Sequence, residues 1–82
     1  MLYRENTNII IYTTSWCGPC KSAKKLLSDY GFDFKEIDIE KENITREQMA
    51  SMTKGLQVPQ IVINGDPIGG FEDLVKYFDA NL

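Results

Sequence analysis

Two cysteines are the residues of this 82-residue chain whose type and spacing suggest chemistry. Cys17 and Cys20 are separated only by Gly18 and Pro19. A thiol pair at this spacing can reduce a disulfide, because one thiolate attacks the substrate and the second lies near enough to release it. Two other interpretations stay open: a short structural disulfide, and two of the four ligands of a metal or cluster site. Since the chain has no histidine, a closed metal site would need thiols from a second chain.

The dithiol lies where a strand is expected to give way to a helix. Residues Asn8–Tyr12 include three consecutive isoleucines, a short apolar run that is typical of a strand buried on both faces. Pro19 suits the first turn of a helix, where its missing N–H costs nothing. The helix that follows has one apolar face, formed by Ala23, Leu26, Leu27 and Tyr30. Gly31 is expected to end this helix.

This placement predicts different roles for the two thiols. Cys17 should lie just before the helix, where free backbone N–H groups and the helix dipole favour a negative charge. Its pKa is therefore expected to fall from ~8.5 toward ~7 or below. Cys20, one turn inside the helix, should be the more buried thiol. We expect Cys17 to attack the substrate and Cys20 to resolve the mixed disulfide.

The remaining elements follow from local patterns. Residues Phe32–Ile39 predict a second strand, although its apolar positions change parity along the way. Thr45 and Gln48 fit a capping box at the start of a short helix that carries Met49 and Met52 and ends near Gly55.

The C-terminal third predicts a hairpin and a final helix. Gln60–Ile63 is a third strand, and Asn64-Gly65 indicates a type I′ turn that returns through an edge strand at Pro67-Ile68. The last helix would bury one face, formed by Phe71, Leu74, Val75 and Phe78. The predicted fold is α/β, in the order β-α-β-α-β-β-α, with a four-stranded mixed sheet flanked by three helices. Residues 1–82 are expected to form one domain.

Composition and charge exclude several functions. With 43% hydrophobic residues the chain can build a core, and its net charge of −3 disfavours nucleic-acid binding. No apolar run approaches the ~20 residues of a membrane span, and the segment Met1–Asn6 lacks the apolar part of a signal peptide. A cytoplasmic protein that binds no membrane is therefore expected. The absence of histidine removes Ser-His and Cys-His catalysis.

Three segments together carry a resemblance to known families. Trp16-Cys17-Gly18-Pro19-Cys20 resembles the active-site motif of thioredoxins. Val58-Pro59 and the segment Ile68–Leu74, with its two glycines and acidic residues, resemble glutaredoxins. The resemblance extends from about Asn8 to Leu82. The chain thus resembles a glutaredoxin, or a glutaredoxin-like redoxin with a thioredoxin-type motif, within the thioredoxin superfamily.

This resemblance implies a thioredoxin-like fold of the glutaredoxin type and a thiol–disulfide oxidoreductase. It implies a cis peptide bond at Val58-Pro59, beside the dithiol, and pairing of the Val58 backbone with a substrate. Glutathione would be a co-substrate, with no metal or organic cofactor. By position its binding residues are Trp16, Pro19, Gln57, Val58, Pro59, Gly70, Phe71, Glu72 and Asp73, with the Asp73 side chain meeting the γ-glutamyl amino group.

Departures from both families leave the reductant open. Ile11 stands where thioredoxins have a buried acid that accepts a proton from the second cysteine. Thr14, Pro19 and Gln57 stand where glutaredoxins usually have a basic residue, a tyrosine and a threonine that touch glutathione. Electrons would then come from glutathione or from a thioredoxin reductase.

The resemblance also suggests partners and rival functions. Disulfide-containing proteins are the implied substrates, with ribonucleotide reductase named by analogy alone, and a monomer is expected. The rival class is a non-enzymatic binder. Either two chains share an iron–sulfur cluster through Cys17 and glutathione, or the fold is an accessory module with idle thiols.

Overall fold

The computed structural model describes residues 4–82 and contains the expected elements in the expected order. The elements are a short 3₁₀ turn at Arg4–Asn6, then β1 (Ile9–Thr13), α1 (Gly18–Asp29), β2 (Lys35–Asp38), α2 (Arg46–Met52), β3 (Gln60–Ile63), β4 (Asp66–Gly69) and α3 (Phe71–Asn81). Met1–Tyr3, which belong to the predicted domain and to the segment predicted to lack a signal peptide, lie outside the described residues. None of the described helices is long and apolar enough to cross a membrane.

The four strands form one mixed sheet in the order β2-β1-β3-β4. The pair β1–β2 is parallel, whereas β1–β3 and β3–β4 are antiparallel. Asn64 and Gly65 have φ angles of 51° and 84°, the two positive values that a type I′ hairpin requires. The sheet places the end of β1 next to the start of β3. Both ends lead into the loops that carry the predicted site.

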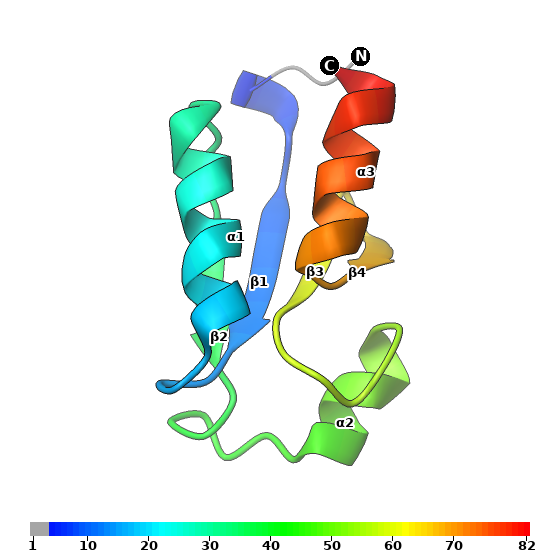
Figure 1. The fold of residues 1–82 in the computed structure, drawn as a ribbon. Coiled ribbons are helices and arrows are strands. Elements are labelled where there is room, and N and C mark those ends of the chain that lie inside the picture. The colour runs from blue at the N-terminus through cyan, green and yellow to red at the C-terminus, as the bar shows by residue number, and fades with distance from the viewer. Residues whose placement is uncertain (1–3) are drawn as a thin grey trace.

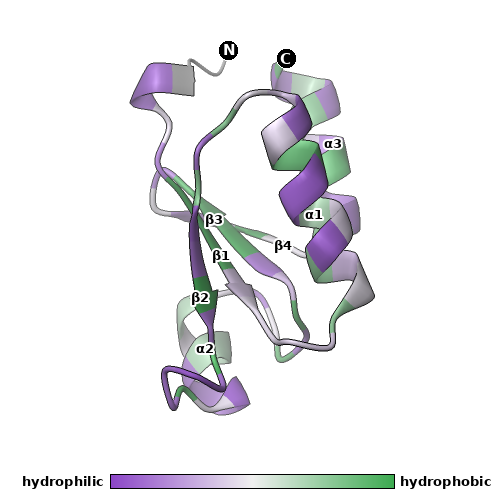
Figure 2. Cartoon of the chain, turned by 90° about the vertical axis from the view of Figure 1, so that its left-hand side faces the viewer, coloured by the Kyte–Doolittle hydropathy of each residue, from purple (hydrophilic) through white to green (hydrophobic). Residues whose placement is uncertain are grey.

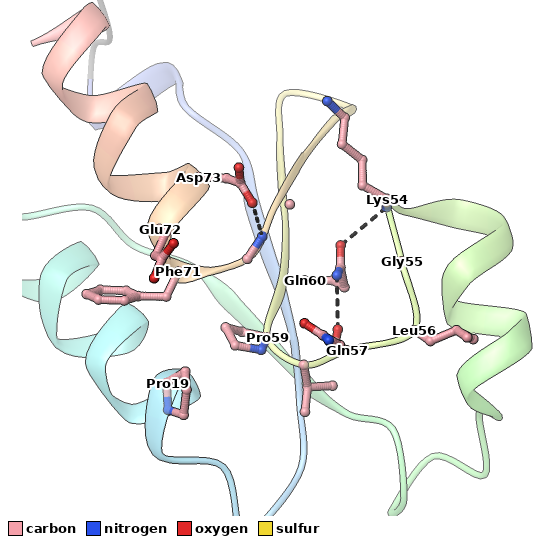
Figure 3. A pocket seen from close by; sticks show the side chains of 13 residues that line it. Pro19, Lys54, Gly55, Leu56, Gln57, Pro59, Gln60, Phe71, Glu72 and Asp73 are labelled. Carbon is pink, nitrogen blue, oxygen red and sulfur yellow. Dashed lines mark hydrogen bonds between the residues drawn. The ribbon is translucent and has the colours of Figure 1, made fainter.

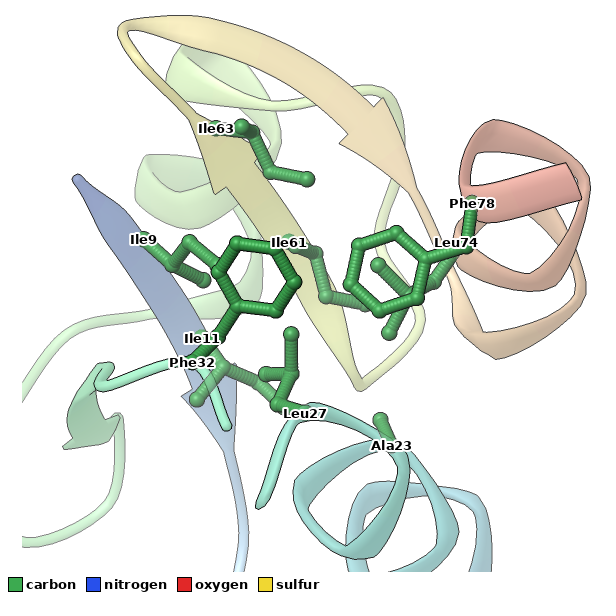
Figure 4. Close-up of a cluster of buried hydrophobic side chains, with 9 residues drawn as sticks. All are labelled: Ile9, Ile11, Ala23, Leu27, Phe32, Ile61, Ile63, Leu74 and Phe78. Atoms are coloured by element: carbon green, nitrogen blue, oxygen red, sulfur yellow. The ribbon is translucent and has the colours of Figure 1, made fainter. Parts of the chain in front are cut away.

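The larger core lies between the sheet and the helices α1 and α3, which run side by side over one face (Figure 1). Figure 4 shows its nine buried side chains, from both central strands, both helices and the segment after α1: Ile9, Ile11, Ala23, Leu27, Phe32, Ile61, Ile63, Leu74 and Phe78. Ala23 and Leu27 confirm the predicted apolar face of α1. Tyr30 was expected on that face but is 44% exposed, because it caps the helix end and meets Phe78 only edge-on.

A smaller core lies on the opposite face, under the short helix α2 (Figure 2). It consists of the buried residues Tyr12, Ile39 and Met49, with partly buried neighbours around them. The capping box is confirmed: the Gln48 N–H donates to Thr45 Oγ1 at 3.0 Å, and the Thr45 N–H donates to Gln48 Oε1 at 2.8 Å. Both predicted methionines lie on α2, which ends at Met52, three residues before the predicted end near Gly55; the Met52 side chain is 49% exposed.

The second strand is shorter than predicted, because the apolar residues of this segment pack into two different cores. Only Lys35–Asp38 pair with β1, although the apolar pattern runs from Phe32 to Ile39. Phe32 and Phe34 pack into the larger core, whereas Ile37 and Ile39 pack into the smaller one. Phe32 belongs to the return from α1, where its N–H donates to the Leu27 carbonyl at 2.9 Å. The segment therefore serves both faces of the sheet, and only its second half is a strand.

Candidate active site

The two cysteines lie at the start of α1 and form a disulfide. Cys17 is the N-cap residue, and the backbone N–H of Cys20 donates to Cys17 Sγ at 3.0 Å. Cys20 is 1% exposed and Cys17 is 7% exposed, so the expected order of burial is confirmed. In the reduced protein the same N–H group and the helix N-terminus would stabilise a thiolate at Cys17.

The loop before β3 meets the dithiol from the other side. The Val58-Pro59 peptide bond is cis, as the resemblance implied, and Pro59 is buried. The carbonyl oxygen of Val58 lies 3.5 Å from Cys17 Sγ. An extended substrate strand that paired with the Val58 backbone would therefore run past the sulfur of Cys17.

A groove of about 680 Å³ opens beside this contact, between the start of α3 and the loop before β3 (Figure 3). It gathers eight of the predicted binding residues: Pro19, Gln57, Val58, Pro59, Gly70, Phe71, Glu72 and Asp73. Trp16 does not line it. Its side chain is 94% exposed beside Cys17, so this residue extends the surface around the dithiol rather than the groove.

The N-terminus of α3 forms one wall of the groove. Gly70 is the N-cap residue, and its N–H donates to Asp73 Oδ2 at 3.0 Å, the contact drawn in Figure 3. Glu72 and Asp73 are the acidic residues of the first turn. Gly69, just before the helix, has a φ of 120° and packs directly against the Asp73 carboxylate. This wall offers backbone N–H groups for a ligand carboxylate and an acidic side chain for a ligand ammonium group.

The opposite wall contains groove residues that sequence reasoning missed. These are Lys54, Gly55, Leu56 and Gln60. Gln60 is only 5% exposed; its amide accepts the N–H of Lys54 at 3.3 Å and donates to the carbonyl of Gln57 at 3.0 Å. The side chain of Arg46 donates to the Leu56 carbonyl at 3.0 Å. A polar residue at the head of the apolar strand Gln60–Ile63 was the available signal, because a buried amide needs partners.

Two carboxylates of β2 accept hydrogen bonds from the end of β1 and from the loop that leads to the dithiol. The hydroxyl of Thr13 donates to Glu36 Oε2 at 2.7 Å, and the hydroxyl of Ser15 donates to Asp38 Oδ2 at 3.2 Å. Hydrogen bonds from Lys24 and then Thr13 hold the pKa of Glu36 below its ordinary value of 4.5. The pKa of Asp38 is lowered mainly by a hydrogen bond from the backbone N–H of Lys41. Hydrogen bonds from the backbone N–H of Glu40 and from the Ser15 hydroxyl lower it further.

The lowered pKa of Glu36 predicts how stability depends on pH. A carboxylate whose pKa is lower in the folded than in the unfolded state stabilises the fold above the unfolded pKa, near 4.5. That contribution is lost as the pH falls through the folded pKa. Urea unfolding of the oxidised protein should therefore show a smaller loss of stability in Glu36→Gln than in wild type between neutral pH and pH about 3. The difference should stay below about 1 kcal/mol, because the Lys24–Glu36 pair is partly exposed. An equal loss of unfolding free energy in both proteins over this pH range would contradict the prediction.

The comparisons with known proteins identify the family. A model of the glutaredoxin family matches residues 9–68. A glutaredoxin of Pseudomonas aeruginosa is 41% identical over 66 residues, which cover 80% of this chain and 79% of the relative. Glutaredoxin 3 of Escherichia coli is 42% identical over 67 residues, which cover 82% of this chain and 81% of the relative. The chain belongs to the glutaredoxin family.

Solved glutaredoxin structures agree with this assignment. An Escherichia coli glutaredoxin superposes with a TM-score of 0.75 at 28% identity, over 92% of this chain and 96% of that one. A buckwheat glutaredoxin solved as a glutathione complex gives a TM-score of 0.79 at 25% identity, over 93% of this chain and 73% of that one. The fold is the thioredoxin-like fold of glutaredoxins. With its Cys17–Cys20 pair, this glutaredoxin is a thiol–disulfide oxidoreductase.

Proposed function

We propose that this glutaredoxin reduces disulfides through a Cys17 thiolate, with Cys20 as the resolving thiol and glutathione as the reductant. The Cys17 thiolate would attack one sulfur of the substrate disulfide, forming a mixed disulfide and releasing the other sulfur as a thiolate that takes up a proton. The Cys20 thiol would then lose its proton and attack Cys17 Sγ, releasing the second sulfur. Two molecules of glutathione would return the protein disulfide to the dithiol, leaving glutathione disulfide.

The observation that carries this proposal is the groove beside Cys17. Glutathione has two carboxylates and one ammonium group, and the groove offers a partner of suitable charge for each. The N-terminus of α3 suits the γ-glutamyl carboxylate, and Asp73 suits the neighbouring ammonium group. Among the described residues that line the groove, Lys54 is the one cation, and it suits the glycyl carboxylate.

The groove also explains how the reacting sulfur would be placed. A peptide bound along the Val58 backbone lies in reach of Cys17 Sγ, which is 3.5 Å from the Val58 carbonyl oxygen. The buckwheat relative is a glutaredoxin–glutathione complex, which supports the same use of the groove here. No three cysteine, aspartate or glutamate side chains among residues 4–82 gather as a metal site, and the proposed cycle requires no resident cofactor.

One observation favours a second reductant. The Trp16 side chain is 94% exposed beside Cys17 and lies outside the groove, where it suits contact with another protein. A thioredoxin reductase would be such a protein. The second candidate is therefore a redoxin that takes its electrons from that enzyme and does not use glutathione.

A paired assay of NADPH consumption separates these candidates. One arm supplies glutathione and glutathione reductase, and the other supplies thioredoxin reductase, with the same disulfide substrate in both. We expect turnover in the glutathione arm. Turnover in the thioredoxin reductase arm alone would replace the proposal by its alternative, and no turnover in either arm by thiols confirmed as reduced would count against both.

Asp73→Asn tests the groove directly. The change removes the charge proposed to meet the γ-glutamyl ammonium group while an amide oxygen can still cap the Gly70 N–H. We expect kcat/KM in the glutathione arm to fall about fivefold to tenfold, as for loss of a charged hydrogen bond. The control is Asp79→Asn, an exposed aspartate near the other end of α3. Equal effects of the two changes would contradict the proposed subsite.

A further inference from the structure

A polar network links Thr13, Lys24 and Glu36 and is not part of the groove. A single carboxylate oxygen, Glu36 Oε2, accepts from Lys24 Nζ at 2.9 Å and from Thr13 Oγ1 at 2.7 Å. Thr13 is 1% exposed, and the side chains of Lys24 and Glu36 are 32% and 38% exposed. The network therefore joins the end of β1, the second turn of α1 and the strand β2 at a partly shielded position.

Two residues of this network are close to the cysteines in the sequence, Thr13 before them and Lys24 after them. Lys24 follows Cys20 by one helical turn, and residues four apart on a helix face have Cβ atoms about 5–6 Å apart. Thr13 precedes Cys17 by four residues, at the point where β1 ends and the active-site loop begins. Glu36 is the register partner of Ile11, the residue that stands where thioredoxins have a buried acid.

The two charges of the pair have opposite effects on a nearby thiolate. A lysine ammonium group favours the thiolate and so favours the reduced form of the dithiol, whereas a carboxylate disfavours it. In the wild-type protein each charge largely offsets the other, because they are 2.9 Å apart. The other charged groups around the dithiol and the groove are constant when the pair alone is changed: Lys21 on α1, Asp38 on β2, Lys54 in the loop before β3, and Glu72 and Asp73 on α3.

We propose that the two charges of the Lys24–Glu36 ion pair act in opposite directions on the dithiol–disulfide equilibrium of this glutaredoxin, with Lys24 favouring the reduced form and Glu36 offsetting that effect. The proposal rests on the interconversion of Cys17 and Cys20 but not on which reductant serves the protein. The pair acts on the cysteines through its field, and the Thr13 hydroxyl fixes the position of the carboxylate.

The experiment measures the equilibrium of the purified full chain with glutathione and glutathione disulfide at neutral pH. In this reaction the dithiol loses two electrons and two protons to form the Cys17–Cys20 disulfide, and one glutathione disulfide becomes two glutathione molecules. Trp16 is the single tryptophan and adjoins Cys17, so its fluorescence reports the fraction oxidised. The variants are Lys24→Gln and Glu36→Gln, the second of which keeps an oxygen that accepts from Thr13.

We expect shifts of opposite sign. Glu36→Gln leaves the ammonium group unpaired, so the equilibrium constant for oxidation should fall about two- to threefold, the size of one partly screened charge at this range. Lys24→Gln leaves the carboxylate unpaired, so the constant should rise about two- to threefold. The double variant, with neither charge, should lie between the single variants and near wild type.

A merely structural role gives a different pattern. Both single changes break the same ion pair, so both should lower the urea midpoint of the oxidised protein. If the role of the pair were only structural, both changes would also move the redox equilibrium in the same direction, or would leave it unchanged. Either of those two redox results would overturn the proposal. The control pair is Lys25–Asp29 on the same helix, whose side chains are 76% and 59% exposed and 3.0 Å apart. Lys25→Gln and Asp29→Asn should leave the equilibrium constant unchanged, and shifts as large as those of the Lys24–Glu36 variants would also overturn it.

Discussion

Cys17→Ser should abolish turnover with every disulfide substrate and with either reductant. A serine hydroxyl at the N-cap of α1 can still accept the Cys20 N–H, so the fold should persist, but it is not a nucleophile toward sulfur at neutral pH. The loss should be at least about 10³-fold in kcat/KM, the order of effect expected when an enzyme loses its nucleophile. The measurement is the coupled NADPH assay on protein whose circular dichroism matches wild type.

Cys20→Ser is the matched control and should behave differently. The protein would keep its attacking thiol, so it should still reduce a mixed disulfide between glutathione and a small thiol. With a protein disulfide it should stop at the mixed disulfide, which mass spectrometry of the intact complex would detect. If Cys20→Ser were the inactive variant and Cys17→Ser the one that accumulates the mixed disulfide, the assigned roles of the two thiols would be reversed.

Gly69→Ala should lower both the stability of the fold and turnover with glutathione. At a φ of 120° any side chain is strained, and a Cβ at this position would overlap with the Asp73 carboxylate. The variant must therefore displace the group that caps α3 and lines the groove. We expect a loss of about 2–4 kcal/mol in the free energy of unfolding, from backbone strain and a weakened cap together. Urea unfolding followed by circular dichroism gives this value.

Gly65→Ala tests the effect of backbone strain without an overlap between the added Cβ and another residue. Gly65 also has a positive φ, of 84°, but a Cβ there would meet no atom within 4 Å. Its replacement should cost about 1 kcal/mol and leave glutathione-dependent turnover unchanged. Gly69→Ala should lose both stability and turnover in the glutathione arm. Equal stability losses in the two variants would show that the contact with Asp73 has no consequence.

Local sequence signals predicted most of the fold because their causes are local. The capping box of Thr45 and Gln48 and the turn at Asn64-Gly65 depend on neighbouring residues alone. The length of β2 could not be predicted in this way. Which half of Phe32–Ile39 pairs with β1 depends on two cores that only the assembled sheet separates.

The site also has parts that the sequence predicts and parts that depend on the assembled fold. The position of Cys17 at a helix start followed from its neighbours, and the groove residues from Val58 to Asp73 followed from family resemblance. The wall around Lys54 and Gln60 did not, because it depends on a buried amide that links residues of one loop. The Lys24–Glu36 pair was also missed, since it joins a helix to a strand and neither residue belongs to a motif.

The two walls of the groove pack against different cores. The start of α3 packs into the larger core through Phe71 and Leu74, whereas the loop before β3 packs through Val58 against the smaller core that contains Met49. Local opening has a free energy that reflects the apolar contacts of each cooperative unit. We therefore expect the loop wall to open while α3 stays closed, which would admit a bulky partner to Cys17 without unfolding the helix that we propose to bind glutathione.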